Sequence, residues 1–452
     1  MAELIMQNQV GEMAAKQTIP AGYKLTEVGV IPQDWNVSML RDISSKITDG
    51  THDTPKPVIE GIPFLTAIHV KDGKIDFDGC YFLPESIHNE IYRRCNPEFG
   101  DILMVNIGSG TATTAVVNVV YEFSLKNVAL IKPNKENNGF YINYALSFSK
   151  NKIIDTILTG GAQPFLSLTQ IALLQVPVPS REEQTTIANV LSDTDALIDV
   201  LEQLIAKKQA IKTATMQQLL TGRTRLPQFA LRPDGTLKGY KSSELGQIPE
   251  DWEVKTLRDM LAESPKYGIN APAVELSRDT PAYIRITDIN SDGYYRPTEK
   301  VGVRSVFSEQ YILHVNDIVL ARTGASVGKS YLYNVDDGPL VYAGFLIKAS
   351  PLQRILNSSY LFQFMKTKEY WDWVLVNSMR SGQPGINGAE FASMLIPTPS
   401  INEQTAIATI LSDMDSELTA LEQKLAKARD LKQGMMQQLL TGRIRLPLEV
   451  VA

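Results

Sequence analysis

One twelve-residue segment occurs twice in this chain almost unchanged. The sequence MQQLLTGRTRLP at 216–227 recurs as MQQLLTGRIRLP at 436–447, with one substitution. The agreement extends upstream without a gap to Ser180 in the first copy and Ser400 in the second. The copies are 220 residues apart (436 − 216), whereas solenoid repeats recur about every 20–50 residues. The chain is therefore predicted to fold as a duplication of one large unit.

A second repeated block opens each half, and the sequence between the blocks differs. GYKLTEVGVIPQDW at 22–35 matches GYKSSELGQIPEDW at 239–252. In the middle, NIGSGTATTAVV from Asn106 aligns with RTGASVGKSYLY from Arg322, and GGAQPFL with RSGQPGI. The predicted segments are an N-terminal extension (1–21), a first variable domain (22–175), a first conserved helix (176–227), a linker (228–250), a second variable domain (251–395), a second conserved helix (396–447) and a tail (448–452).

Each conserved segment is predicted to be one long helix with marked ends. Ser180-x-x-Glu183 and Ser400-x-x-Glu403 are capping boxes, in which the serine accepts a hydrogen bond from a first-turn amide and the glutamate binds back to the cap. A glycine follows the last leucines of both helices, where a left-handed residue commonly ends a helix. A length of about 40 residues at ~1.5 Å per residue gives roughly 60 Å.

An apolar stripe with steps of three and four residues runs along both helices. A seven-residue repeat over this length is typical of a coiled-coil seam, and the simplest partner for each helix is the other copy. The alternative is two amphipathic helices, each packed on its own domain, but such a helix rarely needs this length or a strict heptad. The stripe consists of Ile187, Leu191, Thr194, Ile198, Leu201, Ile205, Lys208, Lys212, Thr215 and Leu219 in the first copy, and of Ile407, Leu411, Met414, Leu418, Leu421, Leu425, Ala428, Lys432, Met435 and Leu439 in the second.

The variable middles have the pattern of mixed α/β domains. Short strand-like runs such as IPFLTAIHV, GDILMVNIG and NDIVLARTG are bounded by turn residues. Helical stretches follow, from Gly139 (GFYINYALSFSKNKIIDTIL) and from Ser358 (SSYLFQFMKTKEYWDWVLV). The predicted fold class is therefore a duplicated pair of α/β (α+β) domains joined by two long helices, which form an antiparallel coiled coil with pseudo-twofold symmetry.

Composition restricts the classes of function. The formal net charge of −6 gives no global attraction to nucleic acid, so DNA binding would have to come from local patches. No apolar run approaches the ~18 residues that cross a bilayer, and the N-terminus lacks the pattern of a signal peptide. Only Cys80 and Cys95 are present, which favours a reducing cytoplasm over a disulfide framework.

Motifs that resemble catalytic signatures fail on spacing. GASVGKS at 324–330 has three residues between its glycines, where a phosphate-binding P-loop has four. NPEF at 96–99 lacks the second proline of the amino-methyltransferase motif, and no G-x-G-x-x-G loop occurs. The four histidines and two cysteines show no metal-ligand spacing. We therefore predict no catalytic residue, no metal and no cofactor in this chain.

Taken together, the repeated motifs resemble the specificity (S) subunit of a Type I restriction-modification system. The motifs are two IP-x-DW entries, two P-S-x-x-EQ-x-x-IA helix starts and two QQLLTGR-x-RLP helix ends. TDGTHDTPKP from Thr48 and ARTGASVGK from Ala321 are similar to loops of that family's target-recognition domains. The likeness extends from Gly22 to Pro447.

The resemblance implies a division of labour among subunits. Each target-recognition domain reads one half of a bipartite site on double-stranded DNA, and the coiled coil sets the gap and docks two methyltransferase subunits. The S subunit has no active site of its own. S-adenosylmethionine belongs to the methyltransferase subunits, which make the complex an adenine-N6 DNA methyltransferase, and ATP and Mg belong to two restriction subunits where these are present. No membrane is involved.

Base reading requires side chains that match the donors and acceptors on base edges: Arg or Lys for guanine, Asn or Gln for adenine, Asp or Glu for cytosine. Polar residues on turns are often merely solvated, and Gln-Pro pairs commonly shape turns. The predicted DNA-binding residues are Lys46, Thr48, Asp49, Thr51, His52, Lys56, Asn106, Ser109, Thr111 and Gln163 in the first domain, and Lys266, Tyr267, Arg285, Arg322, Thr323, Ser326, Lys329, Arg380 and Gln383 in the second.

Two other classes of function remain open from the sequence. One is a coiled-coil scaffold whose two lobes bind proteins and have no DNA specificity. The other is a self-sufficient DNA-modifying enzyme, which the failed motifs disfavour. Specific DNA affinity distinguishes the predicted specificity subunit from the scaffold.

Overall fold

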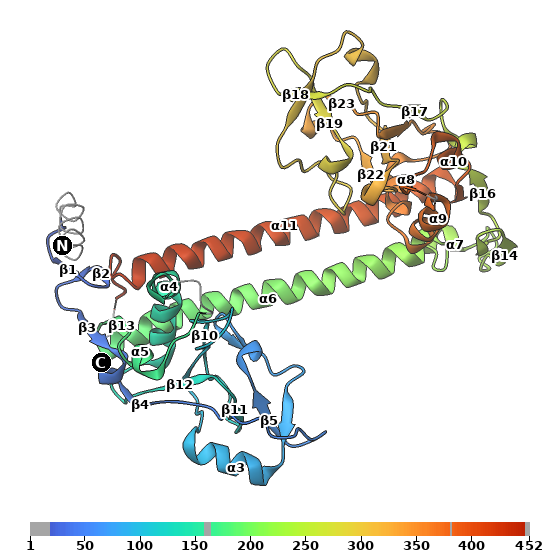
Figure 1. Cartoon of the computed structure of the whole chain (residues 1–452). Helices are drawn as coiled ribbons and strands as arrows, with labels where there is room; N and C mark the ends of the chain where they lie inside the picture. Colours follow the sequence, from blue (N-terminus) through green and yellow to red (C-terminus); the bar gives the residue numbers. More distant parts are fainter. Residues whose placement is uncertain (1–18, 158–163, 380–381, 448–452) are drawn as a thin grey trace. The chain divides into compact units, whose positions relative to one another are not determined.

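The computed structural model describes residues 19–157, 164–379 and 382–447 (Figure 1). The chain divides into two compact units, of which the first comprises residues 1–201 and 424–452 and the second residues 202–423. Helices α6 (Arg181–Leu220) and α11 (Ile401–Leu439) each run from one unit into the other. Each unit therefore contains one variable domain, the first half of that domain's own helix, and the last half of the helix from the other copy.

The first variable domain contains two small sheets with helices beside them. The larger sheet has the order β10-β9-β12-β4 and is antiparallel throughout; the smaller has the order β11-β5-β8, with β11 parallel to β5. The strands are β4 (Ser44–Asp49), β9 (Ile102–Met104), β10 (Thr114–Val116) and β12 (Ala129–Pro133), then β5 (Ile62–Leu65), β8 (Tyr81–Leu83) and β11 (Ser124–Leu125). The remaining elements are hairpins β1–β2 (Tyr23–Thr26, Gly29–Pro32) and β6–β7 (Val70–Lys71, Lys74–Ile75), and helices α2 (Leu40–Ile43), α3 (Glu85–Arg94), α4 (Gly139–Ile157) and α5 (Leu168–Ala172).

The second variable domain repeats this topology. Its sheet β22-β21-β24-β17 has the strand order and directions of β10-β9-β12-β4, and its sheet β23-β19-β20-β18 corresponds to β11-β5-β8 with one strand added. The strands are β17 (Lys266–Tyr267), β21 (Ile318–Ala321), β22 (Ser330–Leu332) and β24 (Leu346–Ala349), then β18 (Ala273–Glu275), β19 (Ala282–Ile284), β20 (Val301–Val303) and β23 (Leu340–Tyr342). The remaining elements are hairpin β14–β15 (Tyr240–Ser243, Gly246–Pro249) and helices α7 (Pro227–Ala230), α8 (Ser358–Phe364), α9 (Lys368–Ser378) and α10 (Gly388–Ala392).

A short two-stranded ladder connects each domain to its long helix. Strand β3 (Asn36–Met39) at the domain entry pairs with β13 (Gln175–Val178) at the exit, and β16 (Glu253–Thr256) pairs with β25 (Leu395–Thr398) in the same way. Each exit strand is followed by a serine whose Oγ accepts the backbone amide three residues later, at 3.2 Å for Ser180 and 3.3 Å for Ser400. The predicted serine caps are confirmed.

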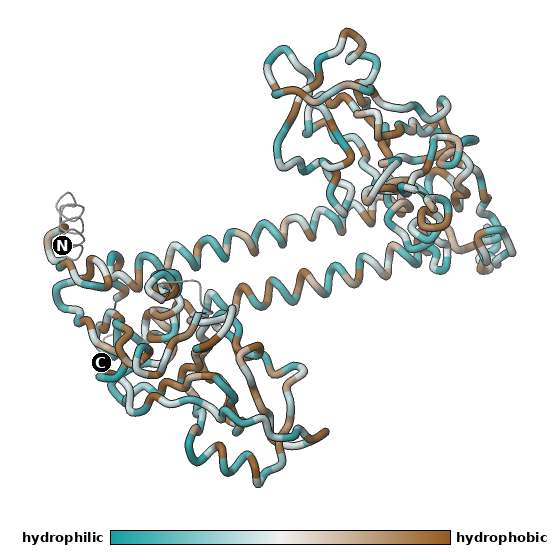
Figure 2. Tube along the Cα trace, viewed as in Figure 1, coloured by the Kyte–Doolittle hydropathy of each residue, from teal (hydrophilic) through white to brown (hydrophobic). Residues whose placement is uncertain are grey.

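The two long helices pack against each other in antiparallel fashion within each unit. In the first unit Asp195 on α6 binds Lys432 on α11 at 2.6 Å, and Leu191 shares a buried core with Leu439. In the second unit Lys208 binds Glu417 at 2.7 Å. Every position of the predicted stripe is buried or half-buried. Figure 2 shows apolar and polar residues alternating along both helices. The predicted fold class is confirmed, and the alternative of helices packed only on their own domains is wrong.

The repeated helix ends explain the repeated sequence, because each one docks on the entry of the other copy's domain. After α6, Gly222 has φ +72°, and a Cβ there would lie 2.5 Å from Pro249 Cδ. After α11, Gly442 has φ +64°, and a Cβ there would lie 2.4 Å from Pro32 Cγ. An arginine three residues later then reaches the glutamate at the start of the other helix.

Two local predictions differ from the structure. The carboxylates of Glu183 and Glu403 do not return to their capping serines; they accept hydrogen bonds from Trp35 and Trp252, each at 3.1 Å, and from the docked arginine. The helical stretch predicted from Ser358 forms two helices: α8 ends at Phe364, and α9 begins after Thr367, whose backbone is extended and whose hydroxyl accepts the Tyr370 amide at 3.3 Å. Among the described residues, no helix is long and apolar enough to cross a membrane.

Candidate nucleic-acid interface

One loop has the same backbone conformation in both domains. We call residues 105–113 the first glycine loop and residues 321–329 the second glycine loop. Gly108 and Gly324 have positive φ, and their amides donate to Pro164 O at 3.1 Å and Pro384 O at 3.0 Å. A second left-handed position follows at Ala112 and Gly328. The sequence alignment of the variable middles is thus reproduced in three dimensions.

The ends of the two loops are closed by the same hydrogen bonds. Val105 N donates to Thr113 O at 2.9 Å, and Ala321 N donates to Lys329 O at 2.8 Å. The residue after the Gln-Pro segment also binds each loop: Leu166 N donates to Asn106 O at 2.8 Å, as Ile386 N does to Arg322 O at 2.9 Å. The fold therefore presents different side chains on one shared backbone frame.

Arg322 is held in place by an aromatic ring and a carbonyl. Its guanidinium carbon lies 5.0 Å above the Tyr267 ring, and Nη1 donates to Gly344 O at 3.5 Å. The Tyr267 hydroxyl in turn accepts the Gly388 amide at 3.0 Å. Among the described residues, the buried Nε of Arg322 has no hydrogen-bond partner. An arginine stacked on an aromatic ring loses less conformational freedom when it binds a planar partner.

The counterpart of Arg322, Asn106, is 6% exposed. No described residue donates to its Oδ1. Thr111 is also buried, and its hydroxyl donates to Gly108 O at 2.7 Å and lies 3.0 Å from Pro164 O. Thr111 therefore shapes the first glycine loop, whereas Ser109 at its tip is exposed. Gln163 lies outside the described residues.

The predicted 46–56 segment begins on β4 and continues into a loop. Asp49 is buried and is bound by Arg94 at 2.6 Å and His52 at 3.0 Å, so its carboxylate is already occupied by protein partners. His52 is exposed and also pairs with Asn127 at 2.8 Å. The predicted residues that remain exposed or half-exposed are Lys46, Thr48, Thr51 and Lys56. Beneath the segment, burial raises the pKa of the Cys95 thiol to about 12.

In the second domain the predicted residues fall into two groups. Thr323, Ser326, Lys329 and Gln383 gather at the second glycine loop, where a Cβ on Gly324 would lie 2.9 Å from Gln383 Nε2. Arg285 instead donates a hydrogen bond to Asp288 at 2.8 Å, and the interaction with this carboxylate raises the pKa of Arg285. Lys266 is exposed and forms an ion pair with Glu263. Arg380 lies outside the described residues.

Sequence reasoning missed the turn that precedes β24. Gly344 supplies the carbonyl for Arg322, and Phe345, which is 57% exposed, accepts the Arg322 amide at 3.0 Å. Phe345 and Arg285 line one cavity of about 260 Å³. This turn reaches the second glycine loop because β24 pairs with β21, a register that no local pattern reveals.

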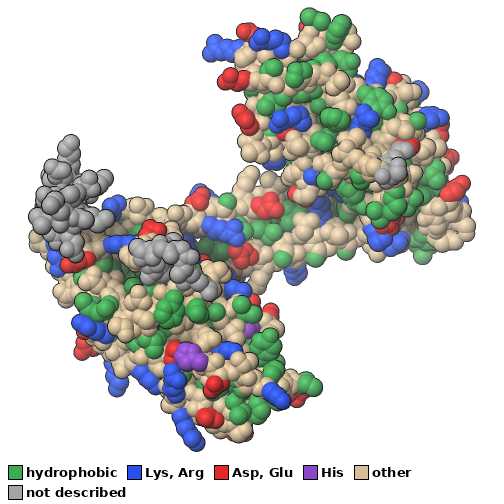
Figure 3. Space-filling view, in the orientation of Figure 1, with side chains coloured by type: hydrophobic (Ala, Val, Ile, Leu, Met, Phe, Trp, Pro, Cys, Tyr) green, Lys and Arg blue, Asp and Glu red, His purple; other side chains and the backbone are tan. Residues whose placement is uncertain are grey.

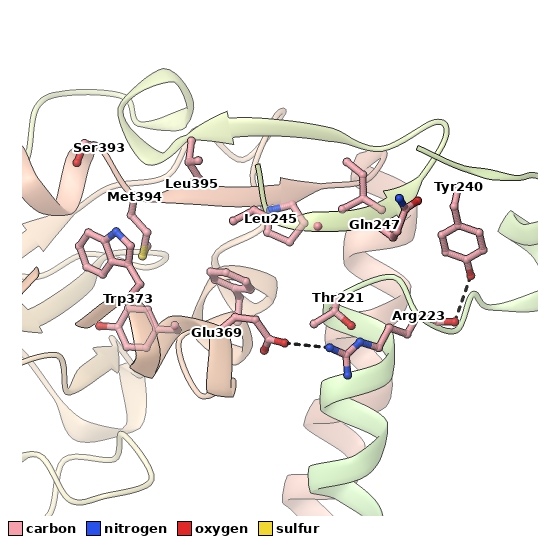
Figure 4. A pocket seen from close by; sticks show the side chains of 15 residues that line it. Thr221, Arg223, Tyr240, Leu245, Gln247, Glu369, Trp373, Ser393, Met394 and Leu395 are labelled. Carbon is pink, nitrogen blue, oxygen red and sulfur yellow. Dashed lines mark hydrogen bonds and ion pairs between the residues drawn. The ribbon is translucent and has the colours of Figure 1, made fainter. Parts of the chain in front are cut away.

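A larger cavity of about 690 Å³ lies where the end of α6 meets hairpin β14–β15 and α9 (Figure 4). Arg223 and Glu369 form an ion pair of 3.7 Å, and the Tyr240 hydroxyl donates to Arg223 O at 3.1 Å. The other lining residues are Thr221, Leu245, Gly246, Gln247, Ile248, Phe364, Tyr370, Trp373, Ser393, Met394, Leu395 and Pro397. None of these residues belongs to the second glycine loop, although the Tyr370 hydroxyl donates to Gly328 O of that loop at 2.5 Å.

On the face shown in Figure 3, the charge distribution fits local contacts better than a wide basic patch. Figure 3 shows basic and acidic side chains interspersed over the face in view. In the part of the chain that the structure describes, no group of three or more His, Cys, Asp or Glu side chains is placed to hold a metal ion. The arrangement provides hydrogen-bonding side chains on loops that are closed by backbone hydrogen bonds, which suits recognition of a ligand.

Comparison with known proteins identifies the family. Residues 32–208 and 249–428 match the Type I restriction modification DNA specificity domain. The putative type I restriction enzyme MjaX specificity subunit of Methanocaldococcus jannaschii is 27% identical over 447 residues, covering 94% of this chain and 97% of that protein. The MjaVIII specificity subunit of the same organism is 25% identical over 435 residues, covering 92% and 94%.

A solved structure shares the fold. The Type-I restriction-modification system S subunit from M. genitalium superposes with a TM-score of 0.59 at 13% identity, covering 94% of this chain and 98% of that one. With two matched domains, and relatives that align along nearly the whole of both chains, this chain belongs to the family of Type I restriction-modification DNA specificity subunits.

Proposed function

We propose that each variable domain reads one half of a bipartite DNA site and that the paired helices set the gap between the halves. The observation that carries this proposal is the pair of glycine loops, which share a backbone frame and differ in their side chains. Arg322 on one frame and Asn106 on the other have different base preferences. Two domains that share the backbone of this loop and differ in its side chains suit the recognition of two different base sequences.

Arg322 is the strongest candidate for direct base contact. Arginine commonly binds O6 and N7 of guanine in the major groove with two hydrogen bonds, and stacking on Tyr267 presents this guanidinium in a fixed orientation. The other exposed predicted residues contribute mainly phosphate and sugar contacts, which make up half or more of such interfaces. The buried Asn106 contributes only after a local rearrangement of its loop.

The chain acts as the non-catalytic member of a larger complex. Two methyltransferase subunits dock on the paired helices and supply S-adenosylmethionine for adenine-N6 methylation, and two restriction subunits supply ATP and Mg where they are present. The family resemblance supports this composition. A chain of formal charge −6 gains little from general attraction to DNA, so partner subunits provide much of the nonspecific affinity.

The test is methylome mapping in a host that carries the chain with its methyltransferase subunit. The expected result is one split adenine-methylation motif. Replacing residues 37–175 with the corresponding domain of another system should change only one half of that motif. The absence of any split motif, together with a lack of specific DNA affinity in the complex, would refute the proposal and favour a protein-binding scaffold.

A further inference from the structure

Three lysines line one small hollow in the second unit. Lys212 comes from α6, Lys329 is the last residue of the second glycine loop, and Lys366 lies between α8 and α9. The hollow has a volume of about 220 Å³. Its other lining residues are Gln209, Thr213, Met216, Ser291, Asp292, Gly293, Ser330, Met365 and Trp371.

Lys366 is a buried cation with weak compensation. Its Nζ lies 4.2 Å from the centre of the Phe362 ring and 5.4 Å from that of Tyr294. The Asp415 carboxylate is 3.9 Å away, and no described residue accepts a hydrogen bond from Nζ. Burial lowers the pKa of Lys366 to about 8, so most of the amine is protonated near neutral pH. A buried donor without an acceptor is costly, and an anionic oxygen would relieve that cost.

The remaining charges of the hollow leave it positive. Lys212 forms an ion pair with Asp415, and Asp292, which also lines the hollow, acts to raise the pKa of Lys366. Within the part of the chain that the structure describes, the hydrogen bond from Lys329 Nζ to Ile289 O is 3.4 Å, which is long for an N–H···O bond. Three cations and two carboxylates leave about one positive charge without a partner.

The corresponding place in the first unit has a balanced set of charges. At the matching positions Thr113 replaces Lys329 and Ser147 replaces Lys366, and the Ser147 hydroxyl lies 3.1 Å from that of Thr114. The remaining lysine, Lys432, is paired with Asp195 at 2.6 Å. Lys150 also lies there: its Nζ binds Asp72 at 2.7 Å and donates to Thr113 Oγ1 at 3.0 Å. Both of these lysines in the first unit therefore have a carboxylate partner, whereas the second unit places three lysines beside two carboxylates, and this excess of positive charge indicates a ligand.

We propose that this hollow binds one phosphate group of the DNA backbone, with Lys366 and Lys329 donating to its oxygens and Lys212 adding charge. The inference rests on the proposed function. A phosphodiester carries one negative charge, which equals the excess of the hollow. Lys329 connects the hollow directly to the second glycine loop, so a phosphate bound here would anchor the DNA strand beside the bases that the loop reads.

The test is Lys366→Met in the full chain assembled with its methyltransferase subunit. Methionine keeps the apolar volume of the side chain and removes the charge. Anisotropy titrations of a labelled duplex carrying the methylation motif, over a series of KCl concentrations, give the slope of log K against log salt. Loss of one phosphate contact should reduce that slope by about 0.9, while the methylated motif stays the same. Lys329→Met should act in the same direction, and Lys366→Arg should retain most of the slope.

Lys241→Met is the matched control, because Lys241 is exposed on β14 and does not line the hollow. Specific binding with an unchanged slope in both Lys366→Met and Lys329→Met would overturn the phosphate site alone. If inorganic phosphate stabilises the unmodified complex while the slope stays unchanged in both variants, the hollow binds a free anion. That result would also overturn the proposal of a DNA phosphate site. A complex with no specific DNA affinity would refute the proposed function instead.

Discussion

Arg225 and Glu403 bind each other through two hydrogen bonds, 2.6 Å from Nε and 2.7 Å from Nη2, although 178 residues separate them in the chain. Arg445 and Glu183 make the same pair in the first unit. Each arginine follows the end of one long helix, and each glutamate lies at the start of the other. The pair therefore joins the last turn of one copy to the first turn of the other.

Removal of Arg225 should destabilise the second unit strongly. The side chains of Arg225 and Glu403 are 6% and 2% exposed, so Arg225→Ala leaves a buried carboxylate without its cation. We expect a loss of about 3–5 kcal/mol in the free energy of unfolding, measured by urea denaturation of the full chain. Arg445→Ala should cost less, because Arg445 is 43% exposed. Arg223→Ala, at a 60% exposed side chain, is the control and should change little; an equal loss there would contradict the role of the buried pair.

Alanine in place of Gly222, after the end of α6, should destabilise the protein, whereas alanine in place of Gly434, inside α11, should stabilise it. Gly222 has φ +72°, and an added Cβ would lie 2.5 Å from Pro249 Cδ, so Gly222→Ala should lower the midpoint of thermal unfolding. Gly434 lies inside α11 with nothing within 4 Å of an added Cβ. Gly434→Ala should raise stability by about 0.5–1 kcal/mol. Equal effects of the two changes would show that the docking contact is not tight.

Loss of the Arg322 guanidinium should change one half of the recognised site. Arg322→Gln removes the two parallel donors that suit guanine, so methylome sequencing should show relaxed specificity at one base pair of the half read by the second domain. Tyr267→Phe keeps the stacked ring and should preserve the motif, whereas Tyr267→Ala should weaken selection at the same base pair. An unchanged motif in Arg322→Gln would exclude this arginine from base reading.

The length of the paired helices should set the gap between the half-sites. Inserting seven residues into both α6 and α11 preserves the seam and adds about 10 Å at ~1.5 Å per residue. At ~3.4 Å per base pair, the unspecified gap in the methylated motif should lengthen by about three base pairs, with both halves unchanged. A gap that stays the same would refute the proposed spacing role.

The buried amine of Lys366 should make stability depend on pH in a defined window. Burial lowers its pKa from 10.5 to about 8, so between these pH values the unfolded chain binds the proton and the folded chain does not. Stability contributed by this group therefore rises with pH in that window. Lys366→Met should be more stable than the unchanged chain at neutral pH, and the difference should shrink as the pH rises from about 8 to 10.5. Denaturation curves at several pH values test this, and a constant difference would contradict it.

Much of the architecture could be predicted because it depends on local patterns. The heptad stripe and the serine caps predicted α6 and α11, since the period of an apolar face reports helical geometry directly. Alignment of the two halves matches Asn106 with Arg322, because both glycine loops occupy the same interval of a duplicated chain. The break at Thr367 was missed, because the apolar periodicity continues across it.

The candidate site was predicted less completely, because polar residues on turns look alike in sequence. Asp49, at the end of β4, and Thr111, in the first glycine loop, proved to be buried and bonded to the protein, while Phe345 contributes a turn that no motif marked. Whether a polar side chain faces solvent or is buried depends on which distant strand pairs with the strand beside it.

By itself, the sequence determined that the chain is duplicated, that each copy ends in a long amphipathic helix, and that two different loops occupy equivalent places. These properties follow from repetition and periodicity within one stretch of chain. Only the tertiary structure decided that Glu403 binds Arg225 rather than its own capping serine, and that Lys212, Lys329 and Lys366 meet around one hollow. Such contacts join residues that are far apart in the chain, and their geometry depends on the packing of the whole unit.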